Sequence, residues 1–308
     1  MNASTHRITG TTDTYLILGD PVEQVRAPES FNAVFARFGI DAVLVPVQIG
    51  PDDLLPFVRA AFKAPNIKGM WVTIPHKVAV TGVLDHCSEI ARVAGAVNAI
   101  RRNADGSLEG GLFDGEGLVA SLDHFGIAYA GRRVLVVGAG GASSAIGASL
   151  VCRGARSVAE LALFDPLPGR AQAVAGQLAA HTAATVRAAP GNDPGGFDLI
   201  INASPLGRKA CDPLPVNVAR MAPHAALVDI LMKNQPTPLV RAARARGLVA
   251  QPGFEMMILQ AHQYLDFMGF HAAAAAVQRD ANFIRAQIYP PALQGEIRHT
   301  VAPPVPTL

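Results

Sequence analysis

The sequence feature that most constrains the fold is a short apolar run that ends in a cluster of glycines. Residues 133–137 read Arg-Val-Leu-Val-Val, and Gly-Ala-Gly-Gly follows before an Ala- and Ser-rich helical pattern. A strand, a tight glycine turn and a helix N-terminus let backbone N–H groups approach a pyrophosphate. The strand before the glycines and the helix after them strengthen this prediction beyond an isolated glycine motif. We therefore predict a dinucleotide-binding loop formed by Gly138, Ala139, Gly140, Gly141, Ala142 and Ser143; a glycine turn that serves packing alone is the alternative.

An acidic residue follows the next apolar run. Residues 160–164 end at Asp165, where a carboxylate can accept hydrogen bonds from the adenosine ribose of NAD and would repel the 2′-phosphate of NADP. Arg170 is the nearest cation and could serve NADP, but it is expected about one turn into the following helix. We expect NAD to be the preferred cofactor, with NADP the alternative. As a further alternative, Asp165 would be the N-cap of that helix.

The rest of the chain alternates strand and helix patterns, which predicts an α/β protein. Half of the 308 residues are hydrophobic and 16% are charged, a balance that suits buried parallel sheets covered by helices. Expected strands are residues 14–19, 42–49, 67–74, 133–137, 160–164, 185–188, 198–202 and 226–230, with a hairpin of residues 99–102 and 108–112. Expected helices are 31–38, 52–62, 77–93, one from about 142, 169–180, 238–246, 255–268 and 271–287.

This order of elements and the chain length predict two domains. The first is an N-terminal α/β domain of residues 1–113, completed by residues 254–308, because the helices after residue 253 have no further strand to reach. The second, residues 114–253, is a Rossmann-type, doubly wound nucleotide-binding domain. The proline-rich end, 289–308, is expected to lie on the surface or to be disordered.

Composition narrows the function classes. The net charge is only +2 and the arginines are scattered, which argues against nucleic acid. The three cysteines, Cys87, Cys152 and Cys211, have no ligand spacing, so we expect no metal site and a reduced compartment. No apolar run reaches the roughly 18 residues of a membrane helix, and the first residues are polar. We expect a cytoplasmic protein, a monomer or homodimer, with a small-molecule substrate.

Several ordered motifs resemble those of the shikimate dehydrogenase family over nearly the whole chain. They are Gly19-Asp20-Pro21 with Pro28, Val72-Thr73-Ile74-Pro75-His76-Lys77, Gly95-Ala96-Val97-Asn98, Asp114-Gly115, the glycine loop, Asn202-Ala203-Ser204-Pro205-Leu206-Gly207, Asp229, Thr237-Pro238-Leu239, and Gly253-Phe254-Glu255-Met256 with Gln260. The resemblance implies that the first domain binds substrate and the second NAD(P). It also implies reversible hydride transfer to or from a ring hydroxyl of a shikimate- or quinate-like cyclic hydroxy acid.

By this resemblance Lys77 and Asp114 match the catalytic pair. Oxidation of an alcohol needs a base that takes the hydroxyl proton as hydride leaves, and a lysine beside a carboxylate can exchange that proton. On local grounds alone, Lys77 would be a solvated residue and Asp114 a helix N-cap. The resemblance also implies substrate contacts from Thr73, Asn98 and Gln260, and cofactor contacts from Asn202, Ser204, Pro205, Leu206, Gly253 and Met256.

The sequence departs from the family where the substrate carboxylate is held. Two serines of the family are Val25 and Ala27 here, an asparagine is Trp71, and Phe113 precedes Asp114. A carboxylate buried there without donors would be costly, so shikimate is expected to bind poorly unless Arg26 supplies the charge. Trp71 could instead belong to the core.

Three hypotheses follow from this pattern. The first is a shikimate dehydrogenase-like enzyme with an altered substrate pocket. The second is a true shikimate dehydrogenase of aromatic amino-acid biosynthesis, which reduces 3-dehydroshikimate with a replaced carboxylate site. The third is a catalytically silent NAD-binding regulatory protein.

Overall fold

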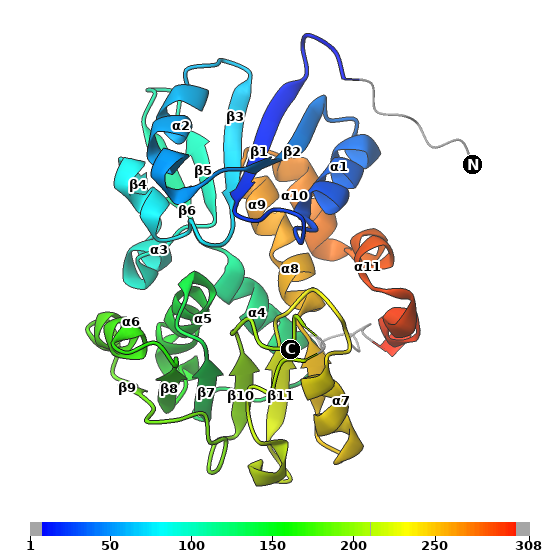
Figure 1. Cartoon of the computed structure of the whole chain (residues 1–308). Coiled ribbons are helices and arrows are strands. Elements are labelled where there is room, and N and C mark those ends of the chain that lie inside the picture. Colours follow the sequence, from blue (N-terminus) through cyan, green and yellow to red (C-terminus); the bar gives the residue numbers. More distant parts are fainter. Residues whose placement is uncertain (1–7, 210, 300–308) are drawn as a thin grey trace. The chain divides into compact units, whose positions relative to one another are not determined.

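The computed structural model describes residues 8–209 and 211–299 and divides by its contacts into two compact units (Figure 1). The first unit takes Met1–Phe113 and Gln260–Ile288, and the second takes Asp114–Leu259 and Tyr289–Leu308. The predicted domain limits differ from these units. The prediction placed residues 254–259 and the chain from 289 onward in the first domain, whereas they belong to the second unit.

Two contacts explain this difference. Helix α8 (Phe254–Leu259) packs on α4 (Asp114–His124). Tyr289 packs on the ring of Phe254 with 5.1 Å between centroids, and its hydroxyl donates to Glu255 at 2.7 Å. The start of the C-terminal segment is therefore held by the second unit. The expected surface position or disorder of residues 300–308 lies outside the described residues.

The first unit contains a six-stranded mixed sheet in the order β2-β1-β3-β5-β6-β4. The strands are β1 (Asp13–Gly19), β2 (Ala42–Gln48), β3 (Ile67–Val72), β4 (His86–Cys87), β5 (Ala99–Arg102) and β6 (Leu108–Gly111). Strand β1 pairs in parallel with β2 and β3, whereas β3, β5 and β6 are antiparallel. The predicted hairpin is confirmed, but it does not form the edge of the sheet, because β4 pairs in parallel with β6 outside it.

The helices of the first unit are α1 (Ala27–Phe38), α2 (Leu54–Ala61), α3 (Glu89–Ala94), α9 (Ala261–Phe267), α10 (His271–Arg279) and α11 (Asn282–Ile288). The expected helix over 77–93 is wrong. A 3₁₀ turn (Ala79–Val83), strand β4 and α3 replace it. Gly82 and the β-branched residues around it disfavour a continuous helix, and Ser88 starts α3 by accepting the Ala91 N–H at 3.3 Å.

The second unit is a six-stranded parallel sheet in the order β12-β11-β10-β7-β8-β9. Its strands are β7 (Arg133–Val137), β8 (Glu160–Phe164), β9 (Thr185–Ala188), β10 (Leu199–Asn202), β11 (Ala226–Asp229) and β12 (Ala250–Pro252). This is the order of a doubly wound sheet, whose direction of winding reverses between β7 and β10. The predicted nucleotide-binding fold is confirmed; α4 and β12 were not predicted.

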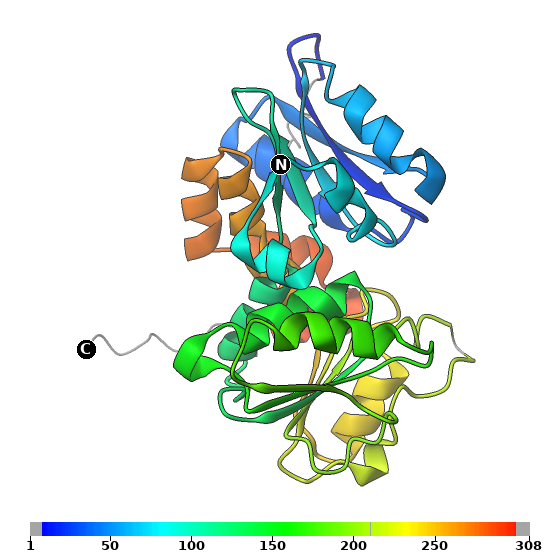
Figure 2. The ribbon, with the colours of Figure 1, turned by 90° about the vertical axis from the view of Figure 1, so that its left-hand side faces the viewer.

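Helices cover both faces of this sheet, with α5 (Gly141–Val151) and α6 (Arg170–Ala179) on one side and α7 (Pro238–Ala245) on the other (Figures 1 and 2). The core between them is apolar: Leu135, Ile200 and Leu227 are fully buried. Such burial on both faces accounts for the continuous apolar runs in the sequence.

Helices α4 and α5 approach each other closely at a glycine, which generates a stability prediction. A Cβ on Gly115 would lie 2.1 Å from the Ala145 carbonyl oxygen and 2.4 Å from Ser149 Oγ. We expect Gly115→Ala to destabilise the protein by about 1–3 kcal/mol or more, because the helix backbones would have to separate. The matched control is Gly176→Ala in α6, where a Cβ would meet nothing within 4 Å. The control should stabilise by about 0.5–1 kcal/mol, and equal urea midpoints for the two variants would contradict the close approach.

Candidate active site

The glycine loop has the geometry that a pyrophosphate requires. Gly138 has φ +107°, and a Cβ there would lie 2.7 Å from the Ala203 carbonyl oxygen, so only glycine fits. Gly140 is extended and a Cβ on it would meet nothing within 4 Å, so the space before the loop is open. Helix α5 then begins at Gly141, and its first-turn N–H groups have no acceptors within the helix.

Ser143 provides a test of whether this loop fits a dinucleotide. Its hydroxyl oxygen is buried and has no hydrogen-bond partner among the described residues. A buried hydroxyl without a partner is costly, and a phosphate oxygen at the N-terminus of α5 would supply an acceptor. The residues of the loop therefore fit the group that the sequence predicts.

Asp165 ties the glycine loop to the end of β8. Its Oδ2 accepts the Ala139 N–H at 2.9 Å, and its Oδ1 accepts the Leu167 N–H at 2.9 Å. A carboxylate has about four acceptor positions, so two stay available for ribose hydroxyls. The alternative N-cap role is wrong, because Gly169 is the N-cap of α6. Arg170 is exposed and is the first residue of α6, not about one turn into the helix as expected.

The loop after β10 is shaped by its own asparagine. Asn202 is fully buried; its Oδ1 accepts the N–H and hydroxyl of Ser204 at 3.1 and 2.7 Å, and its Nδ2 donates to the Leu206 carbonyl oxygen at 3.3 Å. Asn202 therefore determines the loop shape. Pro205 lies in the same turn, and Met256 is buried in α8.

The first unit brings together two of the three predicted substrate-binding polar residues. Asn98 is fully buried; its Oδ1 accepts the Phe113 N–H at 3.0 Å, and its Nδ2 donates to Gln260 Oε1 at 3.4 Å. The chain is thus held one residue before Asp114, which is the first residue of α4. Thr73 and Lys77 lie in the segment after β3, and Lys77 is 9% exposed.

Aromatic rings fill the space beside Asn98. Trp71 is 2% exposed and stacks on Tyr264 with centroids 5.3 Å apart, while Phe31 meets its edge at 5.0 Å. Phe113 meets Tyr264 at 5.0 Å, and the Tyr264 hydroxyl donates to the Asn98 carbonyl oxygen at 3.2 Å. The burial of Trp71 favours its alternative role as a core residue.

The segment that starts α1 offers no side-chain donor at the two altered positions. Val25 and Ala27 are half-buried, and Ala27 is the first residue of the helix. Arg26, between them, pairs with Glu29 at 2.7 Å and donates to the Gln287 carbonyl oxygen at 3.3 Å. Its guanidinium is therefore already engaged within the first unit.

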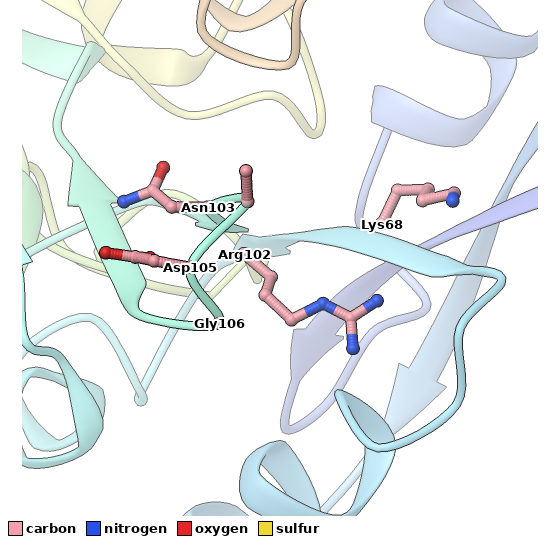
Figure 3. Close-up of a pocket in the computed structure, with 6 residues that line it drawn as sticks. Lys68, Arg102, Asn103, Asp105 and Gly106 are labelled. Atoms are coloured by element: carbon pink, nitrogen blue, oxygen red, sulfur yellow. The ribbon is translucent and has the colours of Figure 1, made fainter.

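Two cavities of the first unit lie elsewhere. One, of about 460 Å³, sits at the β5–β6 turn and is lined by Lys68, Arg102, Asn103, Ala104, Asp105 and Gly106 (Figure 3). It contains none of the predicted site residues. The other, of about 620 Å³, lies against α9 and α10 and shares only Phe113 with the predicted site.

Within residues 8–209 and 211–299, no three His, Cys, Asp or Glu side chains gather as metal ligands would. No helix in the same ranges is long and apolar enough to cross a membrane.

Sequence reasoning gave no role to Asp229, Thr237 and Gln235, which organise the rim of the second unit's sheet. The Asp229 carboxylate accepts hydrogen bonds from Asn202 and Thr237, and Gln235 bonds the backbone around it. The order of motifs included Asp229 and Thr237, but no local pattern reveals their contact with Asn202. A buried polar residue at the end of an apolar strand was the one available signal.

Known proteins support this structure. A model of the shikimate dehydrogenase substrate binding domain matches residues 17–100. A shikimate dehydrogenase (NADP(+)) of Rubrobacter xylanophilus is 37% identical over 261 residues, 83% of this chain and 90% of that protein. Shikimate 5-dehydrogenase of Listeria monocytogenes, solved with shikimate and NAD, is 25% identical with a TM-score of 0.74, and covers 94% of this chain and 100% of that one. The 5-ketofructose reductase of a Gluconobacter species has the same identity and TM-score, with 88% and 99% covered.

These likenesses define the class of protein, a dinucleotide-dependent oxidoreductase that acts on CH–OH groups. Within that class, the chain belongs to the shikimate dehydrogenase family. The resemblance drawn from the ordered motifs is thereby confirmed.

Proposed function

We propose that this protein transfers hydride reversibly between a bound dinucleotide and a ring hydroxyl of a cyclic polyhydroxy compound related to shikimate or quinate. The observation that carries the proposal is the buried Asn98–Gln260 pair, in which Asn98 also accepts the N–H of Phe113, the residue before Asp114. Two amides beside each other can bind neighbouring hydroxyls of one ring. The nicotinamide supplies the hydride acceptor or donor when it is bound.

Lys77 and Asp114 have separate tasks in this proposal. Lys77, which is 9% exposed, takes the hydroxyl proton during oxidation and returns it during reduction. Asp114, 5% exposed at the start of α4, orients the ammonium group and stabilises it. Thr73 and Asn98 hold the ring, while the backbone of the glycine loop holds the pyrophosphate.

NAD is the proposed preferred cofactor. Asp165 keeps acceptor positions at the end of β8 and would repel a 2′-phosphate. The Listeria monocytogenes protein was solved with NAD, whereas the Rubrobacter xylanophilus relative is named for NADP(+). Arg170 is the exposed cation that could serve NADP instead.

We propose that the substrate binds without the side-chain hydrogen bonds that usually hold a carboxylate in this family. Val25 and Ala27 cannot donate hydrogen bonds from their side chains, and Arg26 is engaged with Glu29. The 5-ketofructose reductase of similar fold is named for a ketose, a class of compound without a carboxylate. The names of the shikimate dehydrogenase relatives favour the second candidate, reduction of 3-dehydroshikimate with a different carboxylate site.

A substrate panel with a lysine variant tests the proposed reaction. We expect wild-type protein with NAD to oxidise at least one ring hydroxy acid or its neutral analogue, with NADH followed by absorbance. Lys77→Ala should lower kcat by about 10²–10⁴-fold, since the base is lost. Lys68→Ala is the control, because Lys68 lies at the β5–β6 cavity near Asp13, and it should leave kcat unchanged. If the protein turns over no compound of the panel and Lys77→Ala leaves dinucleotide binding unchanged, the regulatory alternative would be supported.

Restoring the hydroxyls tests the altered pocket. We expect Val25→Ser with Ala27→Ser to raise kcat/KM for shikimate by about tenfold or more, because a hydrogen bond to a charged group contributes about 1.5–3 kcal/mol. Val45→Ser, on the exposed edge of β2, is the control and should have no effect. A wild-type kcat/KM for shikimate of about 10⁴ M⁻¹s⁻¹ or higher would instead favour a true shikimate dehydrogenase.

A further inference from the structure

A buried carboxylate lies at the end of β11 and is surrounded by hydrogen-bond donors. Asp229 is fully buried. Its Oδ1 accepts from Asn202 Nδ2 at 2.9 Å and from the Leu231 N–H at 3.2 Å, and its Oδ2 accepts from Thr237 Oγ1 at 2.6 Å. A carboxylate is tolerated in the interior only when its oxygens are bonded in this way.

The partners of Asp229 lie in two loops. Asn202 bonds Ser204 and Leu206 and so shapes the loop 202–207. Thr237 also accepts the Val240 N–H at 3.3 Å as the N-cap of α7. In the loop 230–237, Gln235 Nε2 donates to the carbonyl oxygens of Asp229 at 3.2 Å and Leu231 at 2.6 Å, and its Oε1 accepts the Thr237 N–H at 3.2 Å. The carboxylate therefore joins two loops that start from neighbouring strands.

Both loops adjoin the predicted dinucleotide site. A Cβ on Gly138 would lie 2.7 Å from the Ala203 carbonyl oxygen and 3.0 Å from the Ser204 nitrogen, so the glycine loop contacts the 202–207 loop directly. A Cβ on Gly253 would lie 2.5 Å from Ile230 Cα. A shift of either loop would therefore move atoms against residues that are predicted to bind cofactor.

We propose that Asp229 is a positioning residue of the dinucleotide site, whose carboxylate holds the loops 202–207 and 230–237 through Asn202 and Thr237. The inference rests on the proposed function, since it assumes that this rim binds the cofactor. Asp229 does not touch the cofactor in this role. It sets the positions of the backbone that does.

The carboxylate accepts all three of its hydrogen bonds when it is ionised, and protonation would disturb this set. The N–H groups of Asn202 and Leu231 cannot become acceptors, so a proton on Oδ1 would face two donors. The groups that bond the carboxylate are neutral, and the nearby cations are directed elsewhere: Arg241 donates to the Pro236 carbonyl oxygen and Arg244 to that of Ala250, while Lys233 is exposed. Burial raises the pKa of the Asp229 carboxyl, although its three hydrogen bonds oppose that shift. Cofactor affinity should therefore decrease as the pH falls through this raised pKa.

Calorimetric titration of NAD⁺ into the full chain tests the proposal. We expect Asp229→Asn to raise the Kd at least tenfold at about pH 8, and to raise the KM for NAD⁺ more than that for substrate. From about pH 8 to about pH 5, the wild-type Kd should rise, while that of Asp229→Asn should change less. The matched control is Asp198→Asn, directly before β10, where the carboxylate also accepts a backbone N–H, from Arg133 at 2.9 Å. It should change the Kd less than threefold.

A second pair of variants covers the case in which Asp229→Asn does not fold. Thr237→Val removes one donor and should weaken NAD⁺ binding, whereas Thr237→Ser keeps the hydroxyl and should retain it. Wild-type affinity in folded Asp229→Asn, or in both Thr237 variants, would overturn the positioning role. Wild-type protein that binds neither NAD⁺ nor NADP⁺ would instead overturn the proposed function, and the inference with it.

Discussion

The parallel register of the second unit's sheet is the constraint on which the rest of the structure depends. Asn202 pairs with Val137 on one side and with Asp229 on the other, and Val137 pairs with Phe164. Because the four strands end level with one another, the segments that follow them all begin at one edge, where doubly wound folds bind their ligands. A slip of one residue would turn a strand's side chains to the opposite face. Asn202 and Asp229 would then no longer meet, and the two loops would lose their shared acceptor.

In the first unit, a single amide has the corresponding role. The Asn98 side chain bonds the backbone of Phe113 and the side chain of Gln260, so it links β5, the end of the hairpin and the start of α9. The rings of Trp71 and Tyr264 stack on each other beside Asn98, and Trp71 is buried. The polar groups there are few and already oriented, which fits the proposed recognition of ring hydroxyls.

Local signals explain which features could be predicted from the sequence. The strand–turn–helix conformation at the glycine loop and the hairpin depend on turn residues and on adjacent apolar runs, and the structure contains both. The expected helix over 77–93 failed because its apolar spacing did not outweigh Gly82 and the β-branched residues near it. The role of Asp229 could not be predicted, because its donors come from separate parts of the chain and meet only through the strand register. Whether Trp71 was core or pocket depended on Tyr264, far along the sequence.

The Asp165 carboxylate accepts the N–H of Ala139 in the glycine loop and that of Leu167, and it retains acceptor positions. The proposed preference for NAD over NADP depends on these positions. The most direct test is therefore the affinity of wild-type protein for NADH and for NADPH, measured by fluorescence titration at neutral pH. We expect the Kd for NADH to be at least tenfold lower, which corresponds to about 1.4 kcal/mol. A Kd for NADPH equal to or lower than that for NADH would contradict the proposed selectivity.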